Sequence, residues 1–178
     1  MACFDVNEDG LVAIGTENAS KKSILIYTSN GTFQYGYEFD SSGSFGVEWD
    51  GNNIIIYLIR SDLAVLTDEK GTVLELYEIE NTIENNSYWN HSVFTPQREV
   101  NNSRYIMKND MGLLNVLASS YSQVVKIDNN ENETIIYDFS DQYAAKVIVI
   151  SAAAIVFSAV VVFVIVFKFK GMKRQSAN

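Results

Sequence analysis

Residues 23–33 read Ser-Ile-Leu-Ile-Tyr-Thr-Ser-Asn-Gly-Thr-Phe, and residues 63–73 read Leu-Ala-Val-Leu-Thr-Asp-Glu-Lys-Gly-Thr-Val. In each stretch a short apolar run meets a turn that contains glycine, and an extended run follows it. Apolar runs rich in Ile, Val, Leu and Tyr that are cut by Gly turns are typical of antiparallel hairpins. The two hairpins therefore indicate an all-β domain, and the surrounding sequence repeats their pattern.

The region 1–141 divides into three units of four predicted strands, at about residues 4–39, 44–79 and 103–139. Four short antiparallel strands that recur about every 40 residues match the period of a propeller blade. In the third unit the turn Asn129-Asn130 has no glycine. The predicted strands cover residues 4–6, 11–16, 23–28, 32–39, 44–49, 53–59, 63–67, 72–79, 103–107, 112–117, 123–127 and 133–139.

The two quoted hairpins resemble the third-to-fourth-strand hairpin of NHL-type and related six-bladed β-propellers, as in bacterial-type membrane-anchored repeat proteins. The resemblance implies propeller-like repeats of about three four-stranded blades and carries over no catalytic residues. Three blades do not close a ring, and an open array leaves sheet faces uncovered. Two interpretations follow: two chains pair to complete a propeller, or the natural protein has further blades upstream. The start at Phe4 and the lack of a signal segment in residues 1–15 favour the second.

Residues 147–167 form an almost unbroken apolar run without charge, Pro or Gly. A helix of these 21 residues is about 31 Å long, which matches a hydrocarbon core of about 30 Å. The sequence therefore predicts one transmembrane helix and the lipid bilayer as a partner. The short tail 168–178 is basic, with Lys168, Lys170, Lys173 and Arg174. Because positive residues gather on the cytoplasmic side, we expect the tail inside and the large N-terminal domain outside; a tail-anchored protein facing the cytoplasm is the alternative.

The charge distribution excludes one class of partner. All 22 acidic residues but only 8 of the 13 basic residues precede Lys146, so that part carries a net charge of 8 − 22 = −14. Such a domain repels phosphate backbones, which argues against nucleic-acid binding. A single cysteine, Cys3, excludes an internal disulfide framework. We expect no cofactor.

A long connection separates the second and third units. This predicted insertion, residues 80–102, carries Tyr88, Trp89, His91 and Phe94 among Asn and Ser residues. Long loops in compact domains tend to be functional, and exposed aromatic side chains suit contacts with a protein or a glycan. These four residues are the candidate ligand-binding residues; the alternative is that the aromatic rings pack over the core.

A second candidate is a calcium loop. Asp5, Asn7 and Asp9 precede Gly10 at alternate positions, as in the first half of a calcium-binding loop. However, Thr16 stands where the bidentate Glu should be, and residues 11–14 alternate as a strand. We therefore predict a turn and no metal site.

These observations predict a single-pass membrane protein whose propeller-like domain is a non-catalytic binding module on the extracytoplasmic face. Two alternatives stay open: a fragment of a larger propeller without activity of its own, and a propeller hydrolase that uses acidic residues near the channel. If the chain does not continue upstream, self-association of two chains would complete the propeller.

Overall fold

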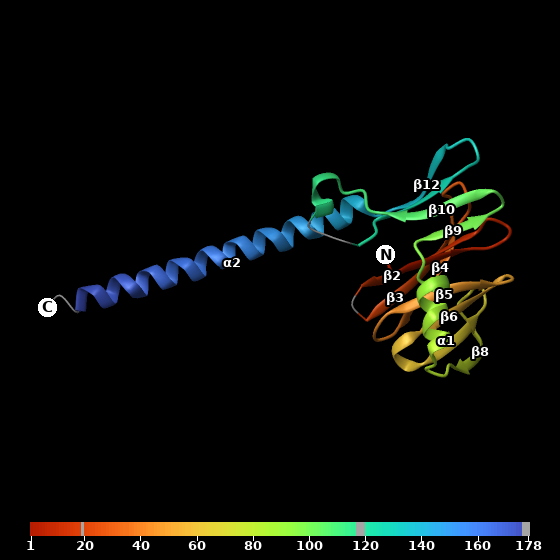
Figure 1. Cartoon of the computed structure of the whole chain (residues 1–178), viewed down its shortest axis with the longest axis horizontal. Helices are drawn as coiled ribbons and strands as arrows, with labels where there is room; N and C mark the ends of the chain where they lie inside the picture. Colours follow the sequence, from red (N-terminus) through yellow and green to blue (C-terminus); the bar gives the residue numbers. More distant parts are fainter. Residues whose placement is uncertain (19, 117–119, 176–178) are drawn as a thin grey trace.

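The computed structural model is mostly β-structure and ends in one long helix (Figure 1). It describes residues 1–18, 20–116 and 120–175, with the side chains of residues 164 and 166–175 left out; the side chains of the predicted basic tail, Leu117 and residues 176–178 lie outside the described part. The elements are β1 Cys3–Val6, β2 Val12–Asn18, β3 Lys21–Tyr27, β4 Phe33–Asp40, β5 Phe45–Asp50, β6 Asn53–Leu58, η1 Ile59–Ser61, β7 Leu63–Thr67, β8 Val73–Glu78, α1 Ile83–Tyr88, η2 Trp89–Val93, β9 Gln97–Val100, β10 Ser103–Lys108, η3 Gly112–Val116, β11 Gln123–Ile127, β12 Glu133–Asp138 and α2 Ser140–Gln175.

The described strands form three antiparallel sheets of four strands, which confirms the coarse fold prediction. The strand orders are β1-β2-β3-β4 in sheet 1, β5-β6-β7-β8 in sheet 2 and β12-β11-β10-β9 in sheet 3. Within each sheet, strands that follow one another in the sequence are hydrogen-bonded neighbours, and the β10–β11 connection is a long loop that contains η3. None of the three sheets closes on itself.

One predicted strand is wrong. Residues 112–116 form the 3₁₀ turn η3 instead of the second strand of the third unit, and Gly112 opens the turn with a φ of +58°. The missing strand is β9, which lies inside the predicted insertion 80–102 and pairs with β10. Asn101 and Asn102 join these two strands with φ values of +50° and +56°, the left-handed pair that a tight two-residue hairpin needs.

The same turn closes the third-to-fourth-strand hairpin of every sheet. In sheet 1 the amide of Gly31 donates to the carbonyl of Thr28 at 3.0 Å, and in sheet 2 Gly71 donates to Asp68 at 3.0 Å. In sheet 3 Glu131 takes the place of the glycine and donates to Asp128 at 3.0 Å. Its φ of +61° is left-handed like those of the two glycines. The turn therefore persists although its glycine is lost.

Sheet 1 is the middle layer of the domain (Figure 1). One of its faces contributes Cys3, Ala13, Ile24 and Ile26 to a core shared with sheet 2, where Phe45, Val47, Ile54, Ile56 and Val65 pack. The opposite face contributes Phe4, Val6, Val12 and Ile14 to a core shared with Tyr105, Met107, Val124 and Ile136 of sheet 3. Burial on both faces explains the unbroken apolar run Leu11–Ile14, because a strand that meets water on one side would alternate.

The first strands of the three sheets converge, since β1 contacts both β5 and β9. The last strands lie at the outer edges, and all six residues of β8 are exposed. The connection from sheet 2 to sheet 3 runs over the converging strands, where η2 contacts β1 and β5. This connection positions the candidate site.

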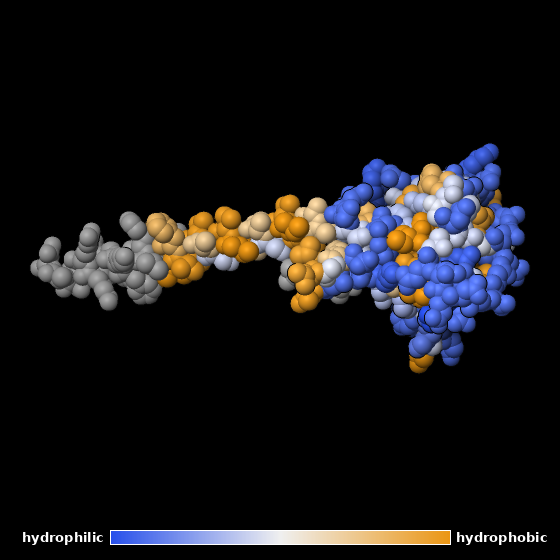
Figure 2. Space-filling model, turned by 90° about the horizontal axis from the view of Figure 1, so that it is seen from above, coloured by the Kyte–Doolittle hydropathy of each residue, from blue (hydrophilic) through white to orange (hydrophobic). Residues whose placement is uncertain are grey.

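Helix α2 leaves the domain at one end (Figure 1). It is the one helix in the described part of the chain that is long and apolar enough to cross a membrane, over Ser140–Phe163. Its side chains from Ile148 to Phe163 are almost all exposed, and the helix forms a hydrophobic rod beside a largely hydrophilic domain (Figure 2).

Candidate functional site

The candidate aromatic residues lie on a short helical connection, α1 followed by the π-helical turn η2. Thr82 caps α1 by accepting a hydrogen bond from the amide of Asn85 at 3.2 Å. Glu84 in the first turn complements the positive end of the helix dipole. A local cap and a favourable charge thus start a helix in a segment that is otherwise rich in Asn and Ser.

Two of the four candidates face the protein interior. Trp89 and Val93 are the buried residues of η2, and Phe94 packs against the core between sheets 1 and 2. Val93 reaches the backbone of β5 because Gly46 has no side chain; a Cβ at Gly46 would lie 2.3 Å from Cγ1 of Val93. Trp89 and Phe94 therefore contribute to packing, and truncating either of them costs stability.

Tyr88 faces outwards and meets sheet 2. Its side chain is 40% exposed, and its hydroxyl donates a hydrogen bond to Oε1 of Glu48 on β5. The hydroxyl of Tyr57 on β6 donates to the other carboxylate oxygen of Glu48 at 2.6 Å. The two rings meet edge to face with centroids 6.5 Å apart. We call these three residues the Tyr88 surface.

Both hydroxyls of the Tyr88 surface stay protonated at neutral pH. Burial, followed by the hydrogen bond to Glu48, raises the pKa of Tyr88 to about 12. The same two causes raise the pKa of Tyr57 well above its ordinary range. The tyrosines therefore act as fixed hydrogen-bond donors to a carboxylate, an arrangement that holds an aromatic ring in place on the surface.

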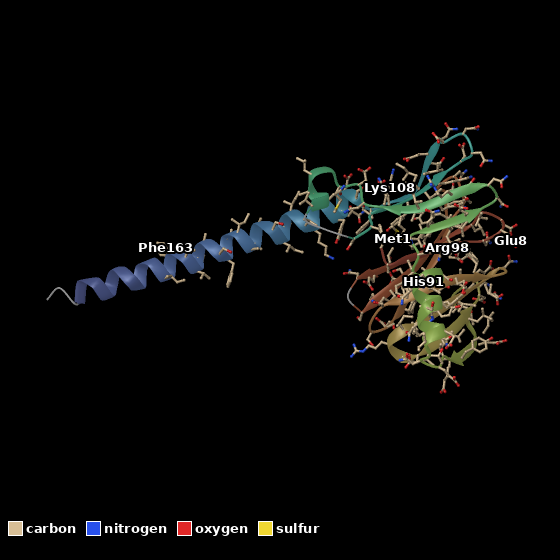
Figure 3. All side chains as sticks on the ribbon, viewed as in Figure 1. Met1, Glu8, His91, Arg98, Lys108 and Phe163 are labelled. Atoms are coloured by element: carbon tan, nitrogen blue, oxygen red, sulfur yellow. The ribbon has the colours of Figure 1, made fainter. Side chains whose placement is uncertain are left out.

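His91, the fourth candidate, is exposed on η2. Its Nδ1 donates to the backbone carbonyl of Ser87 at 2.9 Å, one turn earlier on the same connection. Figure 3 labels His91 near Arg98, in the middle part of the domain. The connection thus presents Tyr88 and His91 to solvent, and Trp89 and Phe94 anchor it.

A hollow of about 420 Å³ adjoins the Tyr88 surface through Glu48. We call it the acidic hollow, because four carboxylates are among its lining residues Asp5, Val6, Asn7, Glu8, Asp9, Glu48, Trp49, Gly51 and Asn52. The hollow and the Tyr88 surface together combine negative charge with exposed aromatic area. Such a surface suits a ligand that carries cationic groups.

Two of the three residues of the calcium candidate, Asp5 and Asn7, already have protein partners. Oδ1 of Asn7 accepts the amide of Leu11 at 2.8 Å and closes the β1–β2 turn at Gly10, whose φ is +80°. Both oxygens of Asp5 accept hydrogen bonds from protein groups. Among the described residues, no three His, Cys, Asp or Glu side chains form a group that could hold a metal ion.

Asp5 forms the centre of a network that joins all three sheets. Its Oδ1 accepts from Nε of Arg98 on β9 at 2.7 Å, and its Oδ2 accepts from the backbone amide of Trp49 on β5 at 2.8 Å. The guanidinium also donates to the carbonyls of Val93, Thr95 and Gln97 at 3.0–3.1 Å. It lies 5.5 Å from the ring centroid of Phe4. The network fixes η2 over the converging strands.

The sequence interpretation missed Glu48, Tyr57 and Arg98. Glu48 lies 40 positions before Tyr88, and no local pattern signals a contact of that length. A local signal did exist for Arg98: the Asn-Asn pair at 101–102 is a hairpin turn, and a turn needs a strand on each side.

A comparison with protein-family models finds no match to this chain, and a search of curated proteins finds none either.

Proposed function

We propose that the protein is a single-pass membrane protein whose β-domain is a non-catalytic binding module, with the Tyr88 surface and the acidic hollow as its contact area. The observation that carries the proposal is Tyr88 itself, an exposed aromatic ring held by Glu48 at the rim of the acidic hollow. A rigid aromatic side chain offers contact area at a low cost in conformational entropy. The ligand class that fits is a basic segment of another protein, with a glycan as the alternative.

The fold supports a propeller-like interpretation of the domain, in which each sheet is a blade of the NHL-like type. The first strands converge as the inner strands of blades do, and sheets 2 and 3 pack on opposite faces of sheet 1. Sheets 2 and 3 follow one another in the sequence but each packs on sheet 1, so the spatial order is 3-1-2. In this arrangement η2 and Arg98 occupy the region of the axis.

Self-association is part of this proposal, because the outer strands of the two end sheets carry exposed hydrophobic side chains. Ile135 on β12 of sheet 3 is 52% exposed, and Tyr77 on β8 of sheet 2 is 45% exposed. If sheet 2 of each copy packs against sheet 3 of the other copy, the two copies together complete a six-bladed ring. The Ile135→Asp variant, compared with wild type by light scattering in lipid nanodiscs, tests this: it should be monomeric where the wild type is dimeric, and a monomeric wild type rejects the pairing.

The membrane part of the proposal rests on α2. Its apolar segment is long enough to span a bilayer, and the basic residues that follow it support a cytoplasmic tail by the positive-inside rule. The domain then faces the extracytoplasmic side, where the Tyr88 surface can meet partners.

Binding can be tested with the full chain in nanodiscs and an array of Lys- and Arg-rich peptides as the probe. Tyr88→Ala and Glu48→Gln should each weaken peptide retention about tenfold or more, as expected for a contact worth at least 1.4 kcal/mol. Two variants are matched controls. Phe33→Ala removes an exposed ring that is 53% accessible on β4, and Glu75→Gln neutralises another glutamate that accepts from a tyrosine, Tyr77. Equal retention by all four variants, or no basic peptide retained by the wild type, would refute the proposed surface.

A further inference from the structure

The segment between β10 and β11 differs in composition from the rest of the domain. Residues 111–121 read Met-Gly-Leu-Leu-Asn-Val-Leu-Ala-Ser-Ser-Tyr and contain no charged residue, although the domain is strongly acidic. Within η3, Leu113 is 95% and Val116 is 90% exposed. No other aliphatic side chain outside α2 in the described residues is as accessible as these two. Water is a poor solvent for such a pair.

Several polar groups of the η3 loop pair within the loop. The amide of Met111 donates to Oδ1 of Asn115 at 2.8 Å, and the amide of Leu114 donates to the carbonyl of Met111 at 3.2 Å. The side-chain amide of Asn115 donates to the carbonyl of Asn109 at 3.2 Å. These polar groups thus pair inside the turn while Leu113 and Val116 are exposed to solvent. An apolar solvent demands this arrangement, because it offers no hydrogen bonds to a free backbone group.

The loop lies beside the start of α2. The amide of Phe139 donates to the carbonyl of Ser122 at 2.9 Å, which ties the end of the loop to the residue before the helix. Ser120 lines the same hollow of about 550 Å³ as Gln142, Tyr143 and Lys146 of the first helical turns. Figure 1 shows η3 next to α2 on the side of the domain from which the helix departs, and hydrophobic residues lie at that end in Figure 2.

The position of Lys146 indicates how close this end of the domain lies to the membrane. It is the last residue before the apolar run that begins at Val147, so it lies at the level of the lipid headgroups when α2 spans a bilayer. A loop beside the helical turns at 142–146 is therefore at the interface between headgroups and acyl chains.

We propose that the η3 loop, Met111–Val116, inserts Leu113 and Val116 into the same phospholipid bilayer that α2 crosses. The inference rests on the proposed membrane span. The occupant is lipid because the exposed aliphatic pair lies at the end of the domain from which the apolar helix leaves (Figure 1), and because the tip carries no charge that would oppose insertion. Two separate contacts fix the tilt and the rotation of the domain on the membrane, so that the Tyr88 surface keeps one orientation towards its ligand.

The test is depth-dependent quenching of a fluorophore on single introduced cysteines. The native Cys3 is 1% exposed and does not react in the folded protein. Leu113→Cys and, separately, Val116→Cys carry an environment-sensitive probe in the full chain, reconstituted in phosphatidylcholine–phosphatidylglycerol vesicles with brominated acyl chains. Two labelled positions calibrate the readout. Ile155→Cys reports the span itself, and Glu8→Cys reports the end of the domain remote from α2 (Figure 3).

Brominated lipid should remove more than half of the emission at positions 113, 116 and 155 and leave the emission at position 8 unchanged. If the probe at position 155 is quenched but the probes at positions 113 and 116 are as little quenched as the probe at position 8, the loop is not inserted, and the proposed span still holds. A blue-shifted but unquenched probe at position 113 would also overturn it, because a protein surface would then cover the loop. An unquenched probe at position 155 would reject the span and the loop together.

Discussion

Replacement of Arg98 tests whether one ion pair joins the three sheets. Asp5 and Arg98 are 12% and 14% exposed, so Arg98→Met leaves a largely buried carboxylate without its cation. Removing one partner of a buried pair costs about 3–5 kcal/mol. We expect about 3 kcal/mol, the lower end of that range, because Asp5 keeps its hydrogen bond from the amide of Trp49. The loss of the carbonyl contacts of Arg98 also frees η2.

The assay is guanidinium unfolding of the full chain in detergent micelles, followed by tryptophan fluorescence. The two tryptophans of the chain, Trp49 and Trp89, both lie around the network and report on its integrity. With a denaturant slope of about 3 kcal/mol per molar, the midpoint should fall by about 1 M. The matched control is Arg104→Met, the same change at an exposed arginine of β10.

The control should change the unfolding free energy by less than about 0.5 kcal/mol. The double variant Asp5→Asn, Arg98→Met should be more stable than Arg98→Met alone, because it no longer buries an unpaired charge. Equal midpoints for Arg98→Met and Arg104→Met would refute the reasoning that the pair joins the sheets.

Three further predictions concern single positions. Gly46→Ala should lower the unfolding free energy by about 1–3 kcal/mol, because its Cβ would lie 2.3 Å from Val93; unchanged thermal unfolding contradicts this. Burial raises the pKa of Tyr37 from 10.0 to about 12, so the buried neutral phenol contributes stability that is fully present below about pH 10 and is lost as the pH rises through about 12; the unfolding midpoint of Tyr37→Phe should fall less steeply over that interval, and an equal slope refutes the assignment. Glu131→Gly should raise the unfolding free energy by about 0.5–1 kcal/mol because it relieves a left-handed φ of +61°; a less stable variant argues against strain there.

The hairpins could be predicted because their information is local. Residues 23–33 and 63–73 combine apolar runs with a glycine that tolerates a left-handed φ, and in the structure they contain the turns that join β3 to β4 and β7 to β8. The apolar run at residues 147–167 predicted a helix for the same reason, and α2 contains it.

The errors have a common physical cause, because the sequence does not say what an apolar or polar residue faces. Leu113 and Val116 are apolar but exposed, and the sequence interpretation took residues 112–117 for a strand. Strand β9 is polar although it lies at the centre, because Arg98 pairs there with Asp5. Both assignments depend on contacts between distant parts of the chain.

In the candidate site, too, the local sequence predicts some features, and others depend on contacts between distant residues. The composition of residues 80–102 identified an aromatic connection, but Tyr88 and Trp89 are adjacent in sequence and have opposite environments. A helix places neighbouring residues about 100° apart around its axis, so one ring can face the core and the next can face solvent. Only the packed structure shows that Tyr88 is the exposed residue and that Glu48 holds it.

The proposal that α2 holds the β-domain on a bilayer has one direct test, the alkaline carbonate wash of membranes from cells that make the full chain. The full chain should stay in the membrane pellet, and a chain that lacks residues 147–167 should move to the supernatant. Recovery of the full chain in the supernatant, with a known membrane protein kept in the pellet, would contradict the proposed anchor.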